Sequence, residues 1–259
     1  MTAAVLHRRI LTLTLIGLVA LAWAALWWLE RSPWGVIFHV HAGHGMHSPA
    51  IDPAAPLGAS LFVAGWVLMT VAMMLPATIP VAEVFRRLVS RRPNAPTLVA
   101  LMLLGYVAAW TGVGLAVYAL QLGLNGYLAT LAPPGWAMAT VLFLLAGGFQ
   151  FSPWKYRCLD RCRTPLGFVL SRWQGGRERL RAFRLGAEHG AFCVGCCWAL
   201  MLLMFAVGTA HLAWMLVLGV IMGLEKNAPW GPRLGHPLGL VLVAVAAILI
   251  IVNLGSGAS

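Results

Sequence analysis

Charged side chains are scarce in this sequence. Only 7 of its 259 residues are Asp or Glu and 18 are Lys or Arg, so 10% of the chain is charged while 61% is hydrophobic. The mean hydropathy is +0.84, whereas soluble globular domains carry about 25% charged residues. The composition excludes an ordinary soluble globule and predicts an all-α protein, a polytopic bundle of transmembrane helices.

Several enzyme motifs are also absent from the sequence. It contains no P-loop, no Rossmann fingerprint, no H-E-x-x-H and no Ser-His-Asp arrangement at local spacing. ATP-driven pumping by this chain alone and hydrolysis through a familiar motif are therefore not expected, and whether the chain is an enzyme stays open. No basic module interleaved with aromatic residues is present, so the net charge of +11 indicates contact with anionic membrane lipid and no nucleic-acid partner.

Apolar stretches separated by clusters of Gly, Pro and Asn predict one integral membrane domain with about seven spans. The spans are expected at about residues 10–29, 57–82, 97–120, 135–152, 189–207, 211–226 and 237–253. The fourth and sixth would reach only ~24–27 Å at a rise of about 1.5 Å per residue. These two either cross with little tilt and snorkelling flanks or are partly re-entrant.

The basic residues predict the orientation of this arrangement. Seventeen of the 18 Lys and Arg residues fall on one side, and Arg31 alone falls on the other. The positive-inside rule then places the N-terminus in the cytoplasm. In this topology residues 30–56 form a His-rich extracytoplasmic loop, and residues 153–186 form a basic, Cys-containing cytosolic loop.

The densest chemical signal is the histidine cluster of the extracytoplasmic loop. Within nine residues it contains His39, His41, His44, Met46 and His47. Neutral imidazole is a common ligand of transition metals, and the glycine spacers let the backbone fold so that several rings converge on one ion. We interpret the segment as a metal-acquiring loop; the alternative is a flexible polar loop.

A second cluster lies at the cytosolic end of the fifth expected span. His189, Cys193 and Cys197 are spaced i, i+4 and i+8, with Cys196 beside them, so they share one face of a helix. Such a stripe cannot surround an ion alone and needs a ligand from a neighbouring helix or a second subunit. The alternative is that cysteine serves here as a small apolar residue for close helix packing.

The remaining two cysteines lie in the basic loop, on the same side of the membrane. A reducing compartment disfavours structural disulfides there. Cys158 and Cys162 are four residues apart, and Arg157 and Arg161 lie nearby to favour thiolates. All five thiols are therefore expected to be free for metal or redox chemistry.

Methionines on the second expected span connect the two clusters. Met69 and Met73 share a helix face, and thioethers favour Cu(I); the alternative is that they fill gaps in an apolar core. Pro76 and Pro80 each free a carbonyl one turn earlier to face a neighbour, a water or an ion. We expect soft ions to pass from the histidines, past these methionines, to the thiols, which bind them more strongly.

Carboxylates are too few to form an extended acidic site. Glu83, Glu188 and Glu225 lie at the cytosolic ends of the second, fifth and sixth spans. We interpret Glu225 and Lys226 as an interfacial ion pair, because charge is least costly at the end of a span. The alternative is that the three carboxylates belong to a cytosolic exit or proton-linked site.

Four motifs in order resemble one known family. They are Met69-Thr-Val-Ala-Met-Met-Leu-Pro76, Gly148-Phe-Gln-Phe-Ser-Pro-Trp-Lys155 leading into Cys158-x-x-x-Cys162-Arg-x-Pro-Leu-Gly167, His189-Gly-Ala-Phe-Cys-Val-Gly-Cys-Cys-Trp198, and Glu225-Lys226. Over about residues 57–226 the chain is similar to an uncharacterised bacterial family of predicted metal-binding integral membrane proteins. The resemblance implies a helical inner-membrane protein with a metal site.

Three function classes follow from these observations. The first is a membrane protein that acquires, transfers or delivers a soft transition metal, with copper favoured and zinc as the alternative ion. Its partners would be membrane lipid and a metal-donor or metal-acceptor protein. The second is a membrane thiol or metal oxidoreductase or assembly factor, and the third is an accessory subunit of a larger membrane enzyme. Whether the chain forms a homo-oligomer is open.

Overall fold

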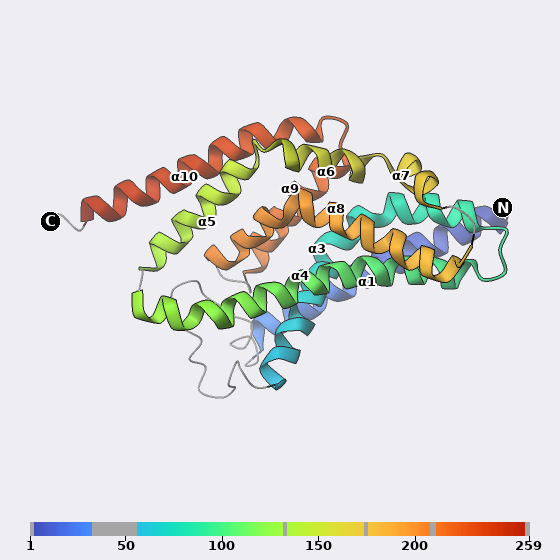
Figure 1. Ribbon diagram of the computed structural model, residues 1–259, viewed down its shortest axis with the longest axis horizontal. Coiled ribbons are helices and arrows are strands. Elements are labelled where there is room, and N and C mark those ends of the chain that lie inside the picture. The colour runs from blue at the N-terminus through green and yellow to red at the C-terminus, as the bar shows by residue number, and fades with distance from the viewer. Residues whose placement is uncertain (1–2, 33–55, 132–133, 174–175, 208–210, 257–259) are drawn as a thin grey trace.

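The computed structural model describes residues 3–32, 56–131, 134–173, 176–207 and 211–256, and this part of the chain is helical, without strands. The helices are α1 (Ala3–Arg31), α3 (Pro56–Val89), α4 (Ala95–Leu131), α5 (Gly135–Phe149), α6 (Pro153–Arg163), α7 (Pro165–Arg172), α8 (Glu178–Val207), α9 (Leu212–Asn227), the short 3-10 helix η1 (Gly231–Leu234) and α10 (Gly235–Ser256). Figure 1 shows them as an elongated bundle. The expected all-α class is confirmed.

Five of the described helices are long and apolar enough to cross a membrane, namely α1, α3, α4, α8 and α10. A sixth crossing arises if α5 and α6, which are bent by 66° at the break between them, form one span. Helix α9 has only 16 residues and α5 only 15. The difference from the expected seven spans therefore concerns the same two segments that the sequence marks as short.

Helix α3 continues through Pro76 and Pro80, and the carbonyl that Pro76 frees finds another donor. A proline at position 76 leaves the carbonyl of Ala72 without its usual helical donor. The indole N–H of Trp23, on α1, donates to this carbonyl at 3.1 Å. The expectation that the prolines expose a carbonyl to a neighbour is confirmed at Pro76, and the contact fixes α1 against α3.

Glycines allow α4 and α8 to pack closely along their length. A Cβ atom at Gly105 of α4 would overlap the carbonyl of Phe183, and one at Gly186 of α8 would overlap the carbonyl of Met102. No larger side chain fits either position without moving a backbone. This contact holds the thiol-bearing face of α8 at a fixed distance from α4.

The segments rich in arginine come together at one end of the bundle. In Figure 1 the N-terminus, the turn between α3 and α4 and helix α7 all lie at that end. Arg92 forms an ion pair with Glu178, and the side-chain amide of Asn94 donates to the same carboxylate at 3.3 Å. These contacts tie the turn after α3 to the start of α8. The C-terminus of α10 lies at the opposite end (Figure 1).

Candidate functional site

The three cysteines of α8 share one buried face, as their spacing predicts. Cys193, Cys196 and Cys197 are each 1% exposed. The thiols of Cys196 and Cys197 donate to the carbonyl of Cys193 at 3.1 and 2.8 Å. Side-chain interactions also link the three thiols to one another. The cluster is therefore compact, and all five cysteines of the chain are free.

One ammonium group lies among three sulfur atoms at this face. The Nζ atom of Lys226, on α9, is 2.8 Å from the Sγ atom of Cys193 and 3.6 Å from the Sγ atom of Cys197. It is also 3.6 Å from the Sδ atom of Met74, on α3. Lys226 is only 7% exposed, so its ammonium donates hydrogen bonds to these sulfurs in place of water. Three helices thus build a buried position for a cation.

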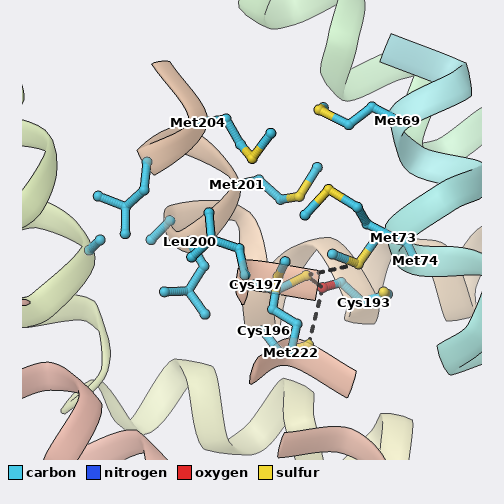
Figure 2. Packing of buried hydrophobic residues seen from close by; sticks show 14 of the residues in the cluster. Met69, Met73, Met74, Cys193, Cys196, Cys197, Leu200, Met201, Met204 and Met222 are labelled. Atoms are coloured by element: carbon cyan, nitrogen blue, oxygen red, sulfur yellow. Dashed lines mark hydrogen bonds between the residues drawn. The ribbon is translucent and has the colours of Figure 1, made fainter. Parts of the chain in front are cut away.

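Two further contacts hold these sulfurs in place. The phenol of Tyr106, on α4, donates to the carbonyl of Met74 at 3.1 Å, and its oxygen is 3.0 Å from the Sγ atom of Cys193. The Sγ atom of Cys197 lies 3.8 Å from the Sδ atom of Met74. Figure 2 shows Met74 beside the cysteines of α8. Tyr106 therefore joins the thiol of one helix to the backbone of another.

Buried methionines continue from this cluster along the interior. Met69 and Met73 of α3 belong to the same core cluster as Cys193, together with Met201 and Met204 of α8. In Figure 2 the side chains of Met73 and Met201 face each other above Cys197. The methionines of α8 extend the cysteine stripe at the same helical spacing. The structure thus places both methionines expected from the sequence in the core cluster that contains the thiols.

Helix α6 adds two thiols that are expected from the sequence in a separate cytosolic loop. Cys158 and Cys162 are both buried. Cys162 interacts through its side chain with Cys196 of α8. A Cβ atom at Gly195 of α8 would lie 2.6 Å from the Sγ atom of Cys158. The four-residue spacing in α6, which repeats that of Cys193 and Cys197, was the signal that α6 presents a matching thiol face.

His189 is buried but is not joined to the thiols by a hydrogen bond. Its ring packs between two aromatic rings. The centroid of the His189 ring is 5.7 Å from that of Tyr106 and 5.5 Å from that of Phe168. Its Nδ1 atom has no hydrogen-bond partner among the described residues. The structure places His189 beside the cluster, one turn from Cys193, and not among the sulfurs around Lys226.

The histidine cluster of the sequence lies outside the described residues. It comprises His39, His41, His44, Met46 and His47. Its expected role as a metal-acquiring loop stays a prediction.

The interpretation of Glu225 and Lys226 as an interfacial pair is wrong. Both side chains are buried, and Glu225 pairs with Lys155 of α6, whose Nζ atom is 2.5 Å from its carboxylate. Lys155 also donates to the amide oxygen of Gln150. Because adjacent residues of a helix point in different directions, the pairing of Glu225 with α6 turns Lys226 toward the sulfurs. Charge at this position is buried and paired, which sequence position alone could not show.

Arg163 fixes the end of α9 that carries these two residues. Its guanidinium donates to the carbonyls of Glu225, Lys226 and Ala228 at 2.8, 3.2 and 2.7 Å. The last carbonyls of a helix lack helical donors, and an arginine there satisfies them and complements the helix dipole. Helix α6 thus holds the backbone of α9 in place at the residue that carries the ammonium.

No three His, Cys, Asp or Glu side chains in the described part of the chain are arranged so that they could hold an ion together. Methionine thioethers are further soft donors. Cys193, Cys197 and Met74 supply two thiols and one thioether, the donor types that select Cu(I). These donor types suit a soft monovalent ion in kind, and the described residues give no support to zinc.

Comparison with known proteins identifies the family. The PpoB2 family, described as a copper chaperone, has a sequence model that matches residues 63–249, and the chain belongs to this family. The match includes the α3 methionines, the α6 and α8 cysteines and Lys226. No curated protein and no solved structure matches the chain.

Proposed function

We propose that this member of the PpoB2 copper chaperone family is an integral membrane protein that binds Cu(I) between Cys193, Cys197 and Met74. The observation that carries the proposal is the Lys226 ammonium, which lies 2.8–3.6 Å from these three sulfurs. A buried position that holds a monovalent cation among soft donors suits Cu(I) in charge and in ligand type. Copper is the cargo of such a protein.

Charge balance explains why a lysine belongs beside this site. Cu(I) held by two thiolates carries one net negative charge, and burying a net charge is costly unless it is paired. Lys226 supplies the matching positive charge. When copper takes its place among the sulfurs, the ammonium moves aside but stays near as the counter-ion, so that the loaded site is neutral.

The methionines supply a path to this site. Met69, Met73, Met201 and Met204 are buried in one core cluster with the thiols, and thioethers bind Cu(I) without adding charge. We propose that copper moves past them to Cys193 and Cys197. The histidines at positions 39 to 47 would collect copper outside, a role that rests on the sequence alone.

The proposed topology has seven spans with a cytoplasmic N-terminus in the inner membrane. It is supported by the basic asymmetry of the sequence and by the meeting of the arginine-rich segments at one end of the bundle (Figure 1). Exposed apolar side chains along α1 and α10 suit contact with lipid. The remaining partner is a protein that donates copper or accepts it.

A thiol oxidoreductase is the second candidate function. The contact between Cys162 and Cys196 brings two thiols from different helices together, which is the arrangement that thiol exchange needs. Incubation with a mild oxidant followed by mass spectrometry separates the two functions. A Cys162–Cys196 disulfide that forms and is reduced again by a dithiol, with no copper binding, would favour the oxidoreductase.

Anaerobic titration of the purified protein with Cu(I) tests the proposed site. We expect the wild type to bind copper with ultraviolet absorption from thiolate–Cu(I) bonds. The double variant Cys193→Ser with Cys197→Ser should lose both the bound copper and this absorption, since serine keeps a hydrogen-bonding hydroxyl but removes the soft donor. The matched control, Cys158→Ser with Cys162→Ser, should bind as the wild type does. Equal binding by the first variant would refute the site.

A further inference from the structure

A pocket of about 470 Å³ lies between α6, the end of α7 and α8. Its lining comprises Trp154, Arg157, Cys158, Asp160, Arg161, Arg172 and Phe192. We propose that this pocket binds a small anionic thiol that carries Cu(I), and that the carrier exchanges its copper with Cys158. The inference rests on the proposed function and names the form in which copper reaches or leaves the site.

Charge in the pocket favours an anion. Arg172 is paired with Glu188, whereas neither Arg157 nor Arg161 has a carboxylate partner within the described ranges. Both are exposed and one helical turn apart on α6. Two unpaired guanidinium groups on one wall match carboxylates, which they bind through two parallel hydrogen bonds. Asp160 offsets only one of these charges.

The size and the walls of the pocket favour a small molecule. A volume of about 470 Å³ lies in the range of roughly 300–1,000 Å³ typical of small-ligand sites. The rings of Trp154 and Phe192 supply apolar surface on two sides. A bare copper ion needs no such cavity, and a folded protein is too large to enter it. A peptide-sized thiol with two or more carboxylates fits both the volume and the charge.

A series of thiols leads from the pocket to the proposed copper site. Cys158 lines the pocket and lies against Gly195 of α8. One turn further along α6, Cys162 contacts Cys196, which in turn contacts Cys193 and Cys197. In the proposed transfer, copper passes along this series of sulfurs from Cys158 to Cys193 and Cys197.

The exchange step balances without a redox partner. The bond between Cu(I) and the carrier's sulfur breaks as a bond forms between Cu(I) and the Sγ atom of Cys158. The thiol proton of Cys158 passes to the carrier's sulfur, which leaves as the free thiol. Copper stays in the Cu(I) state, and the same exchange repeats at each later thiol.

Copper transfer from two carriers tests the inference on the full-length protein in detergent. The probes are Cu(I)–glutathione, whose carrier is anionic, and Cu(I)–cysteamine, whose carrier is cationic. In the double variant Arg157→Gln with Arg161→Gln, we expect the initial rate of transfer from Cu(I)–glutathione to fall about tenfold, the lower end of electrostatic steering effects. The rate from Cu(I)–cysteamine should not fall. The amount of copper bound at equilibrium should equal that of the wild type.

A matched control removes the same charge outside the pocket. Arg177→Gln with Arg179→Gln, at the exposed start of α8, should leave both rates unchanged. Cys158→Ser should slow transfer from both carriers while equilibrium loading stays the same.

The outcomes separate the two proposals. An unchanged glutathione rate in the Arg157/Arg161 variant would overturn the pocket assignment, as would an equal fall in the control. The pocket assignment would also be overturned if these arginines affected the rate of transfer from a copper-loaded protein but not the rate from Cu(I)–glutathione. Failure of the wild type to bind copper from either carrier would instead contradict the proposed copper site.

Discussion

Met74→Leu is the substitution that most sharply separates a copper ligand from a packing residue. Met74 is 0% exposed, and its Sδ atom lies 3.8 Å from the Sγ atom of Cys197 and 3.6 Å from the Nζ atom of Lys226. Leucine conserves the volume, so the free energy of unfolding should change by less than about 1.5 kcal/mol. The chemical change is then the loss of one soft donor of three.

The expected loss of copper affinity is about tenfold, or ~1.4 kcal/mol. It is partial because the two thiolates remain and a neutral thioether is the weaker donor. Met73→Leu is the matched control, since Met73 is the preceding residue of α3 and is also buried, but its side chain packs against Gly219 of α9. The Met73→Leu variant should bind Cu(I) with the same equilibrium affinity as the wild type.

Competition with a chromogenic Cu(I) chelator under anaerobic conditions measures both affinities, and a thermal melt without copper checks that both variants fold. Wild-type affinity in Met74→Leu, with its melting temperature also unchanged, would refute Met74 as a ligand. An equal loss in Met73→Leu would show that the effect comes from packing and not from the thioether.

Three other predictions test the charge, the topology and the packing. Lys226→Met should weaken Cu(I) binding although it adds a thioether, because unit charges about 5 Å apart attract by ~3 kcal/mol at an effective dielectric constant of about 20; tighter binding in the chelator assay would contradict the counter-ion role. In a variant whose only cysteine is Cys158, an impermeant thiol reagent should label inverted membrane vesicles and not intact cells; labelling of intact cells would reverse the topology. Gly186→Ala should lower the melting temperature strongly, because its Cβ atom would overlap the carbonyl of Met102. Gly223→Ala should not, because the space at its Cβ is open. Similar melting temperatures for the two variants would show that α4 and α8 do not pack this closely.

The part of the site that lies on one helix was predictable from the sequence. The four-residue spacing of Cys193 and Cys197 predicts one face, because the α-helix repeats every 3.6 residues. The consequence of Pro76 was predictable for the same local reason, since a proline always frees the carbonyl four residues earlier. Both predictions depend on the geometry of a single helix.

The groups that complete the site come from distant parts of the chain. Met74 is 123 residues from its contact Cys197, and Lys226 is 33 residues from Cys193. No local period predicts which helices become neighbours. The burial of Glu225 was missed for the same reason, because its partner Lys155 lies on α6, 70 residues away.

Copper X-ray absorption spectroscopy of the anaerobically loaded protein tests the central claim most directly. We predict a first coordination shell made of sulfur, which loses sulfur when Cys197 or Met74 is replaced and is unchanged when the histidines at positions 39 to 47 are replaced. A first shell dominated by nitrogen, unchanged in the Cys197 and Met74 variants, would contradict a copper site at the sulfurs around Lys226.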